Sequence, residues 1–270
     1  MMDSSGRAWA ERTATEIPEI AGLDPVVVLP IAAVEQHGPH LPLSTDVDIG
    51  RGLLGAALER LDPSVPAYYL PKLAMGTSEE HSDVPGTLTQ ESSTLIEGIV
   101  ALGRSLERAG VRRLVIHNSH GGNRAAIDVA ALRLRRDCGL LVVKAHWFRF
   151  PRPDERGIPD SEWEHGLHGG AVETAMMMHL RPGLVREEQV CRFTSLAEGL
   201  GPGLEFVRPE GVAPFAWMAR DLNPEGVVGD ATLADPALGA RLVDHYGGIL
   251  AQVIRDAHAF PLERLASPRD

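Results

Sequence analysis

The sequence predicts an α/β fold in which a mostly parallel sheet is covered by helices on both faces. Short runs of β-branched apolar residues alternate with longer segments whose apolar residues recur every three or four positions. This alternation is typical of βαβ units, in which crossover helices bury both faces of a parallel sheet. Because 44% of the 270 residues are apolar, the chain can bury roughly 70–75% of its unfolded surface.

Four strands are expected where short apolar runs lie between turn residues. The clearest run is VVVLPI, at residues 26–31. The other three predicted strands cover residues 67–73, 111–117 and 140–145. A helix is expected after each of them, so the strands can all point in the same direction.

Helices are expected where apolar residues recur on one face. Residues 48–61 have this spacing at Ile49, Leu53, Leu54, Ala57 and Leu58. A second helix, at residues 89–109, ends before Gly110, and a third, at residues 123–138, ends before Gly139; glycine is the usual residue after a helix. The last two predicted helices cover residues 171–180 and 236–258.

Two segments lack periodicity and are expected to be surface excursions. Residues 150–163 are rich in proline and charge, and residues 193–223 are rich in glycine and proline. The sequence has no internal repeat, low-complexity tract or long linker. We therefore expect one domain that spans residues 1–270.

Composition excludes several classes of partner. The net charge of -11 argues against sequence-independent binding to nucleic acid or to anionic membranes. No apolar run is long enough to span a membrane, and residues 1–16 lack the apolar stretch of a signal peptide. Cys138 and Cys191 stand far apart and outside any Cys-x-x-Cys pattern. A cytoplasmic protein without disulfides is expected.

A cluster of potential metal ligands follows the first predicted strand. In an extended segment Glu35 and His37 point to the same face, and Asp46 can reach back after the turn at residues 38–42. Three ionisable groups at a strand end cost free energy unless something satisfies their charges. The mixture of oxygen and nitrogen ligands suits zinc, manganese or iron better than calcium or magnesium.

Two further polar clusters are expected near the first. Residues 117–123 (HNSHGGN) follow the third strand, and residues 165–173 (HGLHGGAVE) lead into a helix. Ligands of open parallel sheets bind beyond the carboxyl ends of the strands, which brings the first two clusters side by side. Within them His120 has the better loop position, whereas His117 is expected to be a surface or core residue. His146, His179, His245 and His258 lack clustered partners.

Four motifs occur in order along the chain: Glu35-Gln36-His37-Gly38-Pro39-His40-Leu41-Pro42 with Thr45-Asp46; Gly76-Thr77-Ser78 and Glu80-His81 with Pro85-Gly86-Thr87; Ser119-His120-Gly121-Gly122-Asn123; and His168-Gly169-Gly170 with Glu173-Thr174. Together with the tail Gly226-Val227-Val228-Gly229-Asp230-Ala231-Thr232, they resemble the creatininase (creatinine amidohydrolase) family. The resemblance covers about residues 26–254.

The resemblance implies a three-layer α/β/α sandwich, a dinuclear metal centre and commonly a hexamer. It implies metal ligation by Glu35, His37, Asp46 and His120, with Asp46 bridging two ions. Creatininase proper carries a glutamate at the position of Gly122, so Glu173 is the candidate for the remaining ligand. The His-Gly-Gly-Asn version belongs to other branches of the family, which include a formamide-cleaving, a peptide-trimming and a cyclic keto-inositol-cleaving enzyme.

The resemblance also implies roles in proton transfer and substrate binding. His168 matches the histidine that handles protons, and it is expected one layer further from the strand ends than His120. Glu173 is the second candidate catalytic residue. The motifs supply Ser78, His81 and Asn123 as candidate substrate-binding residues. Trp147, with Phe150, Trp163 and Trp217, offers aromatic surfaces for a flat ring; ordinary packing or subunit contact is the alternative for these four.

The expected function is therefore metal-dependent amide hydrolysis of a small-molecule substrate. Two divalent ions per chain (Zn, Mn or Fe) would activate a water for attack on a C–N bond other than a peptide bond, in a small amide, formamide or cyclic amide. His168 would protonate the leaving nitrogen. One alternative is hydrolysis of a cyclic polyol or lactone at the same site; another is a non-catalytic metal-binding module.

Overall fold

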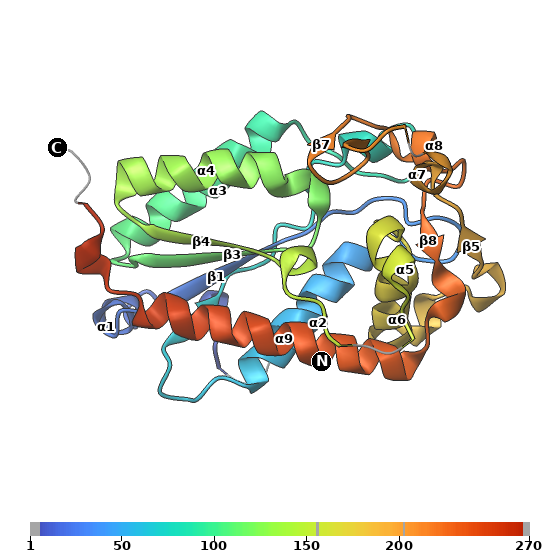
Figure 1. Cartoon of the computed structure of the whole chain (residues 1–270). Helices are drawn as coiled ribbons and strands as arrows, with labels where there is room; N and C mark the ends of the chain where they lie inside the picture. Colours follow the sequence, from blue (N-terminus) through green and yellow to red (C-terminus); the bar gives the residue numbers. More distant parts are fainter. Residues whose placement is uncertain (1–5, 155–156, 202, 267–270) are drawn as a thin grey trace.

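A four-stranded parallel sheet forms the centre of the computed structural model, which describes residues 6–154, 157–201 and 203–266. The strand order is β2-β1-β3-β4; Figure 1 labels β1, β3 and β4. In this register Val28 lies opposite Tyr69 on one side and opposite Val115 on the other. The strands are β1 (Val26–Ile31), β2 (Ala67–Tyr69), β3 (Arg113–Asn118) and β4 (Leu141–His146).

The strand predictions are confirmed, with one shortened element. β1 has the predicted bounds, and β3 and β4 are displaced by one or two residues. β2 ends at Tyr69 instead of residue 73. Pro71 lacks a backbone N–H and interrupts the ladder, although Leu73 still forms an isolated bridge with Ile31.

Helices cover both faces of the sheet, which confirms the three-layer α/β/α prediction. Helices α3 (Ser92–Arg108) and α4 (Arg124–Cys138) lie on one face, and α2 (Thr45–Glu59) and α9 (Pro236–Ala259) lie on the other (Figure 1). Successive side chains of each strand point to opposite faces of the sheet, so alternate residues pack against the two helical layers. Val27, Leu29 and Ile31 pack with α3 and α4, and Val26 and Val28 pack with α2 and α9.

The remaining elements lie around these layers. Helix α6 (Ala171–Leu180) has its predicted bounds and packs against α9. The periodicity did not predict the short helices α1 (Ile17–Gly22), α5 (Asp160–His165), α7 (Leu196–Gly199) and α8 (Ala219–Leu222).

Two small sheets pair β5 (Arg192–Phe193) with β8 (Gly229–Asp230), and β6 (Val207–Arg208) with β7 (Ala213–Pro214). The single 3-10 turns are η1 (Trp9–Glu11), η2 (Glu79–His81), η3 (Gly121–Asn123), η4 (Trp147–Arg149), η5 (Pro182–Leu184), η6 (Glu187–Gln189), η7 (Ala231–Leu233) and η8 (Leu262–Arg264).

One difference from the prediction concerns the site. Helix α2 begins at Thr45, three residues earlier than predicted, so Asp46 lies in its first turn instead of in a preceding loop. Residues 1–5 and 155–156, which belong to the segments predicted as a non-signal N-terminus and a surface excursion, lie outside the described residues. No helix of the described part is long and apolar enough to cross a bilayer.

His117 connects the sheet to α2 and has a structural role, as expected. It is buried in β3, and its Nε2–H donates to the carbonyl of Gly50 at 3.0 Å. Burial disfavours the charged ring and lowers the pKa of His117 to about 4. The folded protein therefore holds this imidazole neutral over a pH range in which the unfolded chain protonates it.

We expect His117→Gln to flatten the pH dependence of stability. Because the pKa is lower in the folded state, the stabilisation is complete above about pH 6.5 and is lost as the pH falls towards 4. This group accounts for on the order of 3 kcal/mol across that window. Urea denaturation at several pH values measures the free energy of unfolding. Parallel curves for variant and wild type would contradict the assignment.

Candidate metal centre

Six acidic and histidine side chains converge beyond the carboxyl ends of β1 and β3. Glu35 and His37 follow β1, and His120 follows β3 by two residues. Asp46 comes from the first turn of α2 and Glu173 from the first turn of α6; the loop before α6 carries His168. Glu35, His37, Asp46 and His120 are at most 4% exposed. The three polar clusters of the sequence thus form one site.

Asp46 lies between two groups of ligand atoms. On one side, Nδ1 of His120 is 3.1 Å from Oε1 of Glu35 and 3.3 Å from Oδ2 of Asp46. On the other side, Nε2 of His37 is 3.5 Å from Oδ1 of Asp46 and 3.9 Å from Oε2 of Glu173. In each group the three ligand atoms lie within 4.8 Å of one another, close enough to coordinate one ion. Asp46 contributes a different oxygen to each group.

Backbone carbonyls determine which nitrogen of each imidazole is available. Nε2–H of His120 donates to the carbonyl of Thr77 at 2.8 Å, and Nδ1–H of His37 donates to the carbonyl of Glu35 at 3.1 Å. In the neutral ring the other nitrogen therefore carries the lone pair, and in both residues it is the nitrogen that faces Asp46. A carbonyl that holds the distal N–H is the usual second partner of a metal-ligating histidine.

The cluster lacks the positive charge that its carboxylates require. Within the described part of the chain, every ion pair to Glu35, Asp46 or Glu173 comes from a histidine. Two buried atoms, Nε2 of His37 and Oδ2 of Asp46, have no hydrogen-bond partner. Orphaned buried polar atoms are costly, and a divalent cation would satisfy both of them. These residues therefore fit a metal ion.

The same shortage of positive charge shifts the pKa values. Burial opposes the charged form of His37, yet the carboxylate of Asp46, 3.5 Å from its Nε2, raises its pKa to about 9. Burial, partly offset by His37, raises the pKa of Glu173 to about 7. For Asp46, burial is outweighed by the adjacent rings of His120 and His37, and the pKa falls to about 2. The cluster attracts protons that a bound cation would displace.

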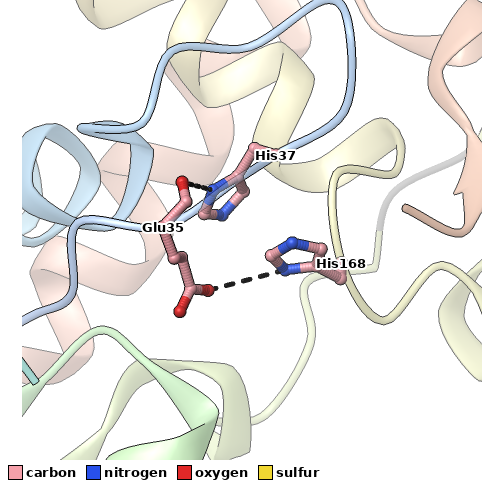
Figure 2. A group of neighbouring side chains, drawn as sticks. All are labelled: Glu35, His37 and His168. Atoms are coloured by element: carbon pink, nitrogen blue, oxygen red, sulfur yellow. Dashed lines mark hydrogen bonds and ion pairs between the residues drawn. The ribbon is translucent and has the colours of Figure 1, made fainter. Parts of the chain in front are cut away.

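His168 lies closer to the ligand groups than the sequence suggests (Figure 2). Its Nδ1 is 3.8 Å from Oε1 of Glu35, and its ring centroid is 4.2 Å from that of His37. Its Nε2–H donates to the carbonyl of Gln36 at 2.8 Å, which leaves the lone pair on Nδ1. The carbonyl of His168 in turn accepts from the N–H of Val228, which joins the loop before α6 to the segment that leads into β8.

The candidate substrate-binding residues separate into two pairs. Ser78 is fully buried, and its hydroxyl donates to Oε2 of Glu35 at 2.6 Å. Asn123 is also fully buried; its amide nitrogen donates to Ala32 and Asn118, and its oxygen accepts from the N–H of Thr77. Neither side chain reaches the cavity. His81 and Trp147 do line it.

A cavity of about 970 Å³ opens above the cluster. The cluster side chains that line it are Glu35, Asp46, His120, His168 and Glu173. Aromatic residues form part of its wall, among them Trp147, Trp163, Phe215 and Trp217. Phe150 is outside this wall and packs in the core instead. The cavity thus combines a charged cluster with apolar walls, the usual composition of a small-ligand site.

Glu162 and Gln36 support the site, although neither was predicted to do so. The buried Glu162 accepts from the N–H of Ala171 at 2.7 Å and from the N–H of Asp230 at 2.6 Å, and so joins the start of α6 to β8. It belongs to the charge-rich excursion, where no local pattern marks a buried residue. The side chain of Gln36 joins the backbone of Gly38 to that of Gly226, and its position in the first motif, between two predicted ligands, was the available signal.

The chain is similar to known proteins over most of its length. The family model described as creatininase, creatinine amidohydrolase, matches residues 10–254. A mycofactocin precursor peptide peptidase of Mycolicibacterium smegmatis is 31% identical over 230 residues, covering 83% of this chain and 82% of that protein. The Mycobacterium tuberculosis protein of that name is 34% identical over 239 residues, with coverage of 85% and 83%. A creatinine amidohydrolase of Pseudomonas putida is 31% identical over 199 residues, with coverage of 67% and 73%.

Solved structures show the same fold. A structure described as a manganese creatininase has a TM-score of 0.75 and 27% identity, and the match covers 93% of this chain and 98% of that one. A mutant creatininase described as a Zn-Zn type has a TM-score of 0.70 and 26% identity, with coverage of 92% and 96%. These related structures hold manganese or zinc.

Gly122 lies where the chain has no room for a side chain. A Cβ there would be 2.4 Å from the carbonyl oxygen of Thr77, 2.5 Å from Nε2 of His120 and 2.6 Å from Oε1 of Glu80. The neighbouring Gly121 has nothing within 4 Å of its Cβ position. The side chain of Glu80 thus occupies the space that a larger residue at position 122 would need.

We expect Gly122→Ala to weaken metal binding at least tenfold, because the new methyl group must displace the ring of His120 or the carbonyl that orients it. Gly121→Ala is the matched control and is expected to bind metal like the wild type. Competition with a chromogenic chelator for zinc or manganese measures the affinity, and thermal denaturation of the metal-free proteins checks folding. Equal affinities for the two variants would disprove the steric argument.

Proposed function

The chain belongs to the creatininase family, and from this premise we propose that it hydrolyses a C–N amide bond at a dinuclear metal centre. The observation that carries the proposal is the position of Asp46, which contributes one carboxylate oxygen to each of two adjacent ligand groups. A bridging carboxylate with mixed nitrogen and oxygen ligands is the arrangement that two-metal hydrolases use.

One ion would be held by Glu35, Asp46 and His120, and the other by His37, Asp46 and Glu173. When bound, such ions lower the pKa of a water and polarise a carbonyl group. Zinc, manganese and iron all accept these ligands. Glu173 thereby provides the carboxylate that creatininase proper has at the position of Gly122.

His168 would move the proton. Its Nδ1 carries a lone pair, because Nε2–H is held by the carbonyl of Gln36. As the oxygen of water bonds to the carbonyl carbon, Nδ1 of His168 takes a proton from that water. The same proton then passes to the leaving nitrogen as the C–N bond breaks. The products are a carboxylic acid, which keeps the second proton of the water, and an amine; passing that proton from acid to amine gives a carboxylate and an ammonium, and His168 returns to its starting form.

A peptide amide is the substrate class best supported. Relatives that are 31–34% identical over more than 80% of both chains are described as peptide peptidases. The cavity of about 970 Å³ also exceeds the needs of a single small ring. We therefore extend the expected substrates, which were C–N bonds other than peptide bonds, to include the amide of a short peptide.

We expect the metal-loaded protein to hydrolyse members of a panel of short peptides, formamides and cyclic amides, and to bind up to two equivalents of metal. His120→Ala should lower metal content and turnover together. His168→Ala should keep its metal but lose roughly 10²–10⁴-fold in kcat. The matched control is His179→Ala, at an exposed histidine of α6. Elemental analysis and product detection provide the two readouts.

Each component of this proposal has an outcome that would refute it. Less than about a tenth of an equivalent of metal after reloading would exclude the dinuclear centre. Loss of metal in His168→Ala would make His168 a ligand. Stoichiometric metal binding without hydrolysis of any amide or lactone would favour a binding module, whereas hydrolysis of lactones alone would favour the alternative substrate class.

We also propose a closed homo-oligomer, hexameric as in the family pattern. Exposed apolar side chains support this assembly: Leu204, Phe206, Val207 and Val212 are 44–85% exposed. They belong to the segment that also lines the cavity through Phe215 and Trp217. Light scattering at micromolar concentration should give six times the chain mass of 29.1 kDa. The mass of one chain would refute the assembly.

A further inference from the structure

We propose that Gln36 fixes His81 as a neutral N–H donor, and that this donor binds the carbonyl oxygen of the scissile amide. The inference rests on the proposed hydrolytic function and adds a catalytic residue, His81, and a positioning residue, Gln36. The carboxamide of Gln36 is buried and makes several hydrogen bonds beside the candidate ligands.

The orientation of the Gln36 carboxamide is fixed by the backbone. Its Oε1 accepts from the N–H of Gly38 at 2.9 Å, and its Nε2 donates to the carbonyl of Gly226 at 2.6 Å. If the amide nitrogen and oxygen of Gln36 were exchanged, its oxygen would face the carbonyl oxygen of Gly226. Its NH2 group would then face the N–H of Gly38, and neither pair could form a hydrogen bond. The nitrogen must therefore occupy the assigned position, and it has one further proton to donate.

That second proton determines the tautomer of His81. Nε2 of Gln36 lies 2.8 Å from Nδ1 of His81. An amide nitrogen only donates, so Nδ1 must accept, and a neutral imidazole then carries its proton on Nε2. Nε2 of His168 also lies 3.2 Å from the Gln36 nitrogen, but its proton is already directed to the Gln36 carbonyl at 2.8 Å. It therefore does not compete for the amide proton.

The Nε2–H of His81 remains available at the cavity. His81 lines that cavity, and its Nε2 lies 3.5 Å from Oε1 of Glu35, which is too long for a good hydrogen bond. Its ring stacks on that of His168 at 4.3 Å between centroids, with an interplanar angle of 26°. The neighbouring imidazoles thus have opposite roles: His168 has a free lone pair and His81 has a free N–H.

Amide hydrolysis requires both of these roles. When water adds to the carbonyl carbon, the carbonyl oxygen gains negative charge and the water loses a proton. His168 takes that proton, whereas the N–H of His81 stays on its ring and forms a stronger hydrogen bond to the charged oxygen. Removal of one such donor typically costs about 10²–10³-fold in kcat.

Substitutions at His81 test the donor. His81→Asn has no donor near the Nε2 position, whereas the longer His81→Gln can place an amide N–H there. We expect His81→Asn to lose about 10²–10³-fold in kcat with little change in KM or metal content. We expect His81→Gln to retain a clearly larger share of the wild-type kcat than His81→Asn does. If His81 only supported Glu35, metal binding would weaken and excess metal would restore activity. That result, or unchanged kcat in His81→Asn, would overturn the proposal.

The tautomer is tested independently of activity. In zinc-loaded protein labelled with ¹⁵N-histidine, the long-range ¹H–¹⁵N pattern of His81 should show the proton on Nε2. Gln36→Glu places an acceptor beside Nδ1 and should move a proton there, whereas Gln252→Glu, at an exposed position of α9, should not. A wild-type proton on Nδ1 would overturn the role of Gln36. Absence of hydrolysis by the wild type would instead refute the proposed function, which keeps the two failures distinct.

Discussion

The site depends on one electrostatic constraint: three carboxylates are gathered at a buried point where only histidines pair with them. Glu35, Asp46 and Glu173 come from three separate segments, and within the described part of the chain no lysine or arginine forms an ion pair with them. Such a group is stable only if a cation replaces the missing positive charge. Metal binding and the stability of this region should therefore be coupled.

The fold reduces the cost of gathering these charges. Parallel strands direct their carboxyl ends to the same edge, so the segments that follow β1 and β3 meet without long connections. Asp46 and Glu173 each lie in the first turn of a helix, α2 and α6. The partial positive charge at a helix N-terminus favours a carboxylate there. Because α2 begins at Thr45, Asp46 lies at this helix N-terminus. The earlier start of the helix therefore contributes to the site.

Sequence patterns predicted the elements and the convergence of the candidate ligands, because both follow from local periodicity and strand direction. β1 and α6 have their predicted bounds, and Glu35, Asp46 and His120 meet as expected. The roles of single polar side chains were less predictable. Ser78 and Asn123 belong to matched motifs, yet both are buried in supporting hydrogen bonds. Glu162 supports α6 from a segment without periodicity, and only its tertiary partners reveal its role.

The protonation pattern of the histidines is what a sequence encodes least directly. Four imidazoles crowd the site, and each can carry its proton on either nitrogen. The carbonyls of Thr77, Glu35 and Gln36 assign it for His120, His37 and His168, and the Gln36 side chain assigns it for His81. Three of these four partners are backbone atoms, which every residue possesses. The chemistry of the rings is therefore set by where the chain passes, so substitutions that shift these loops should alter catalysis while leaving every ligand in place.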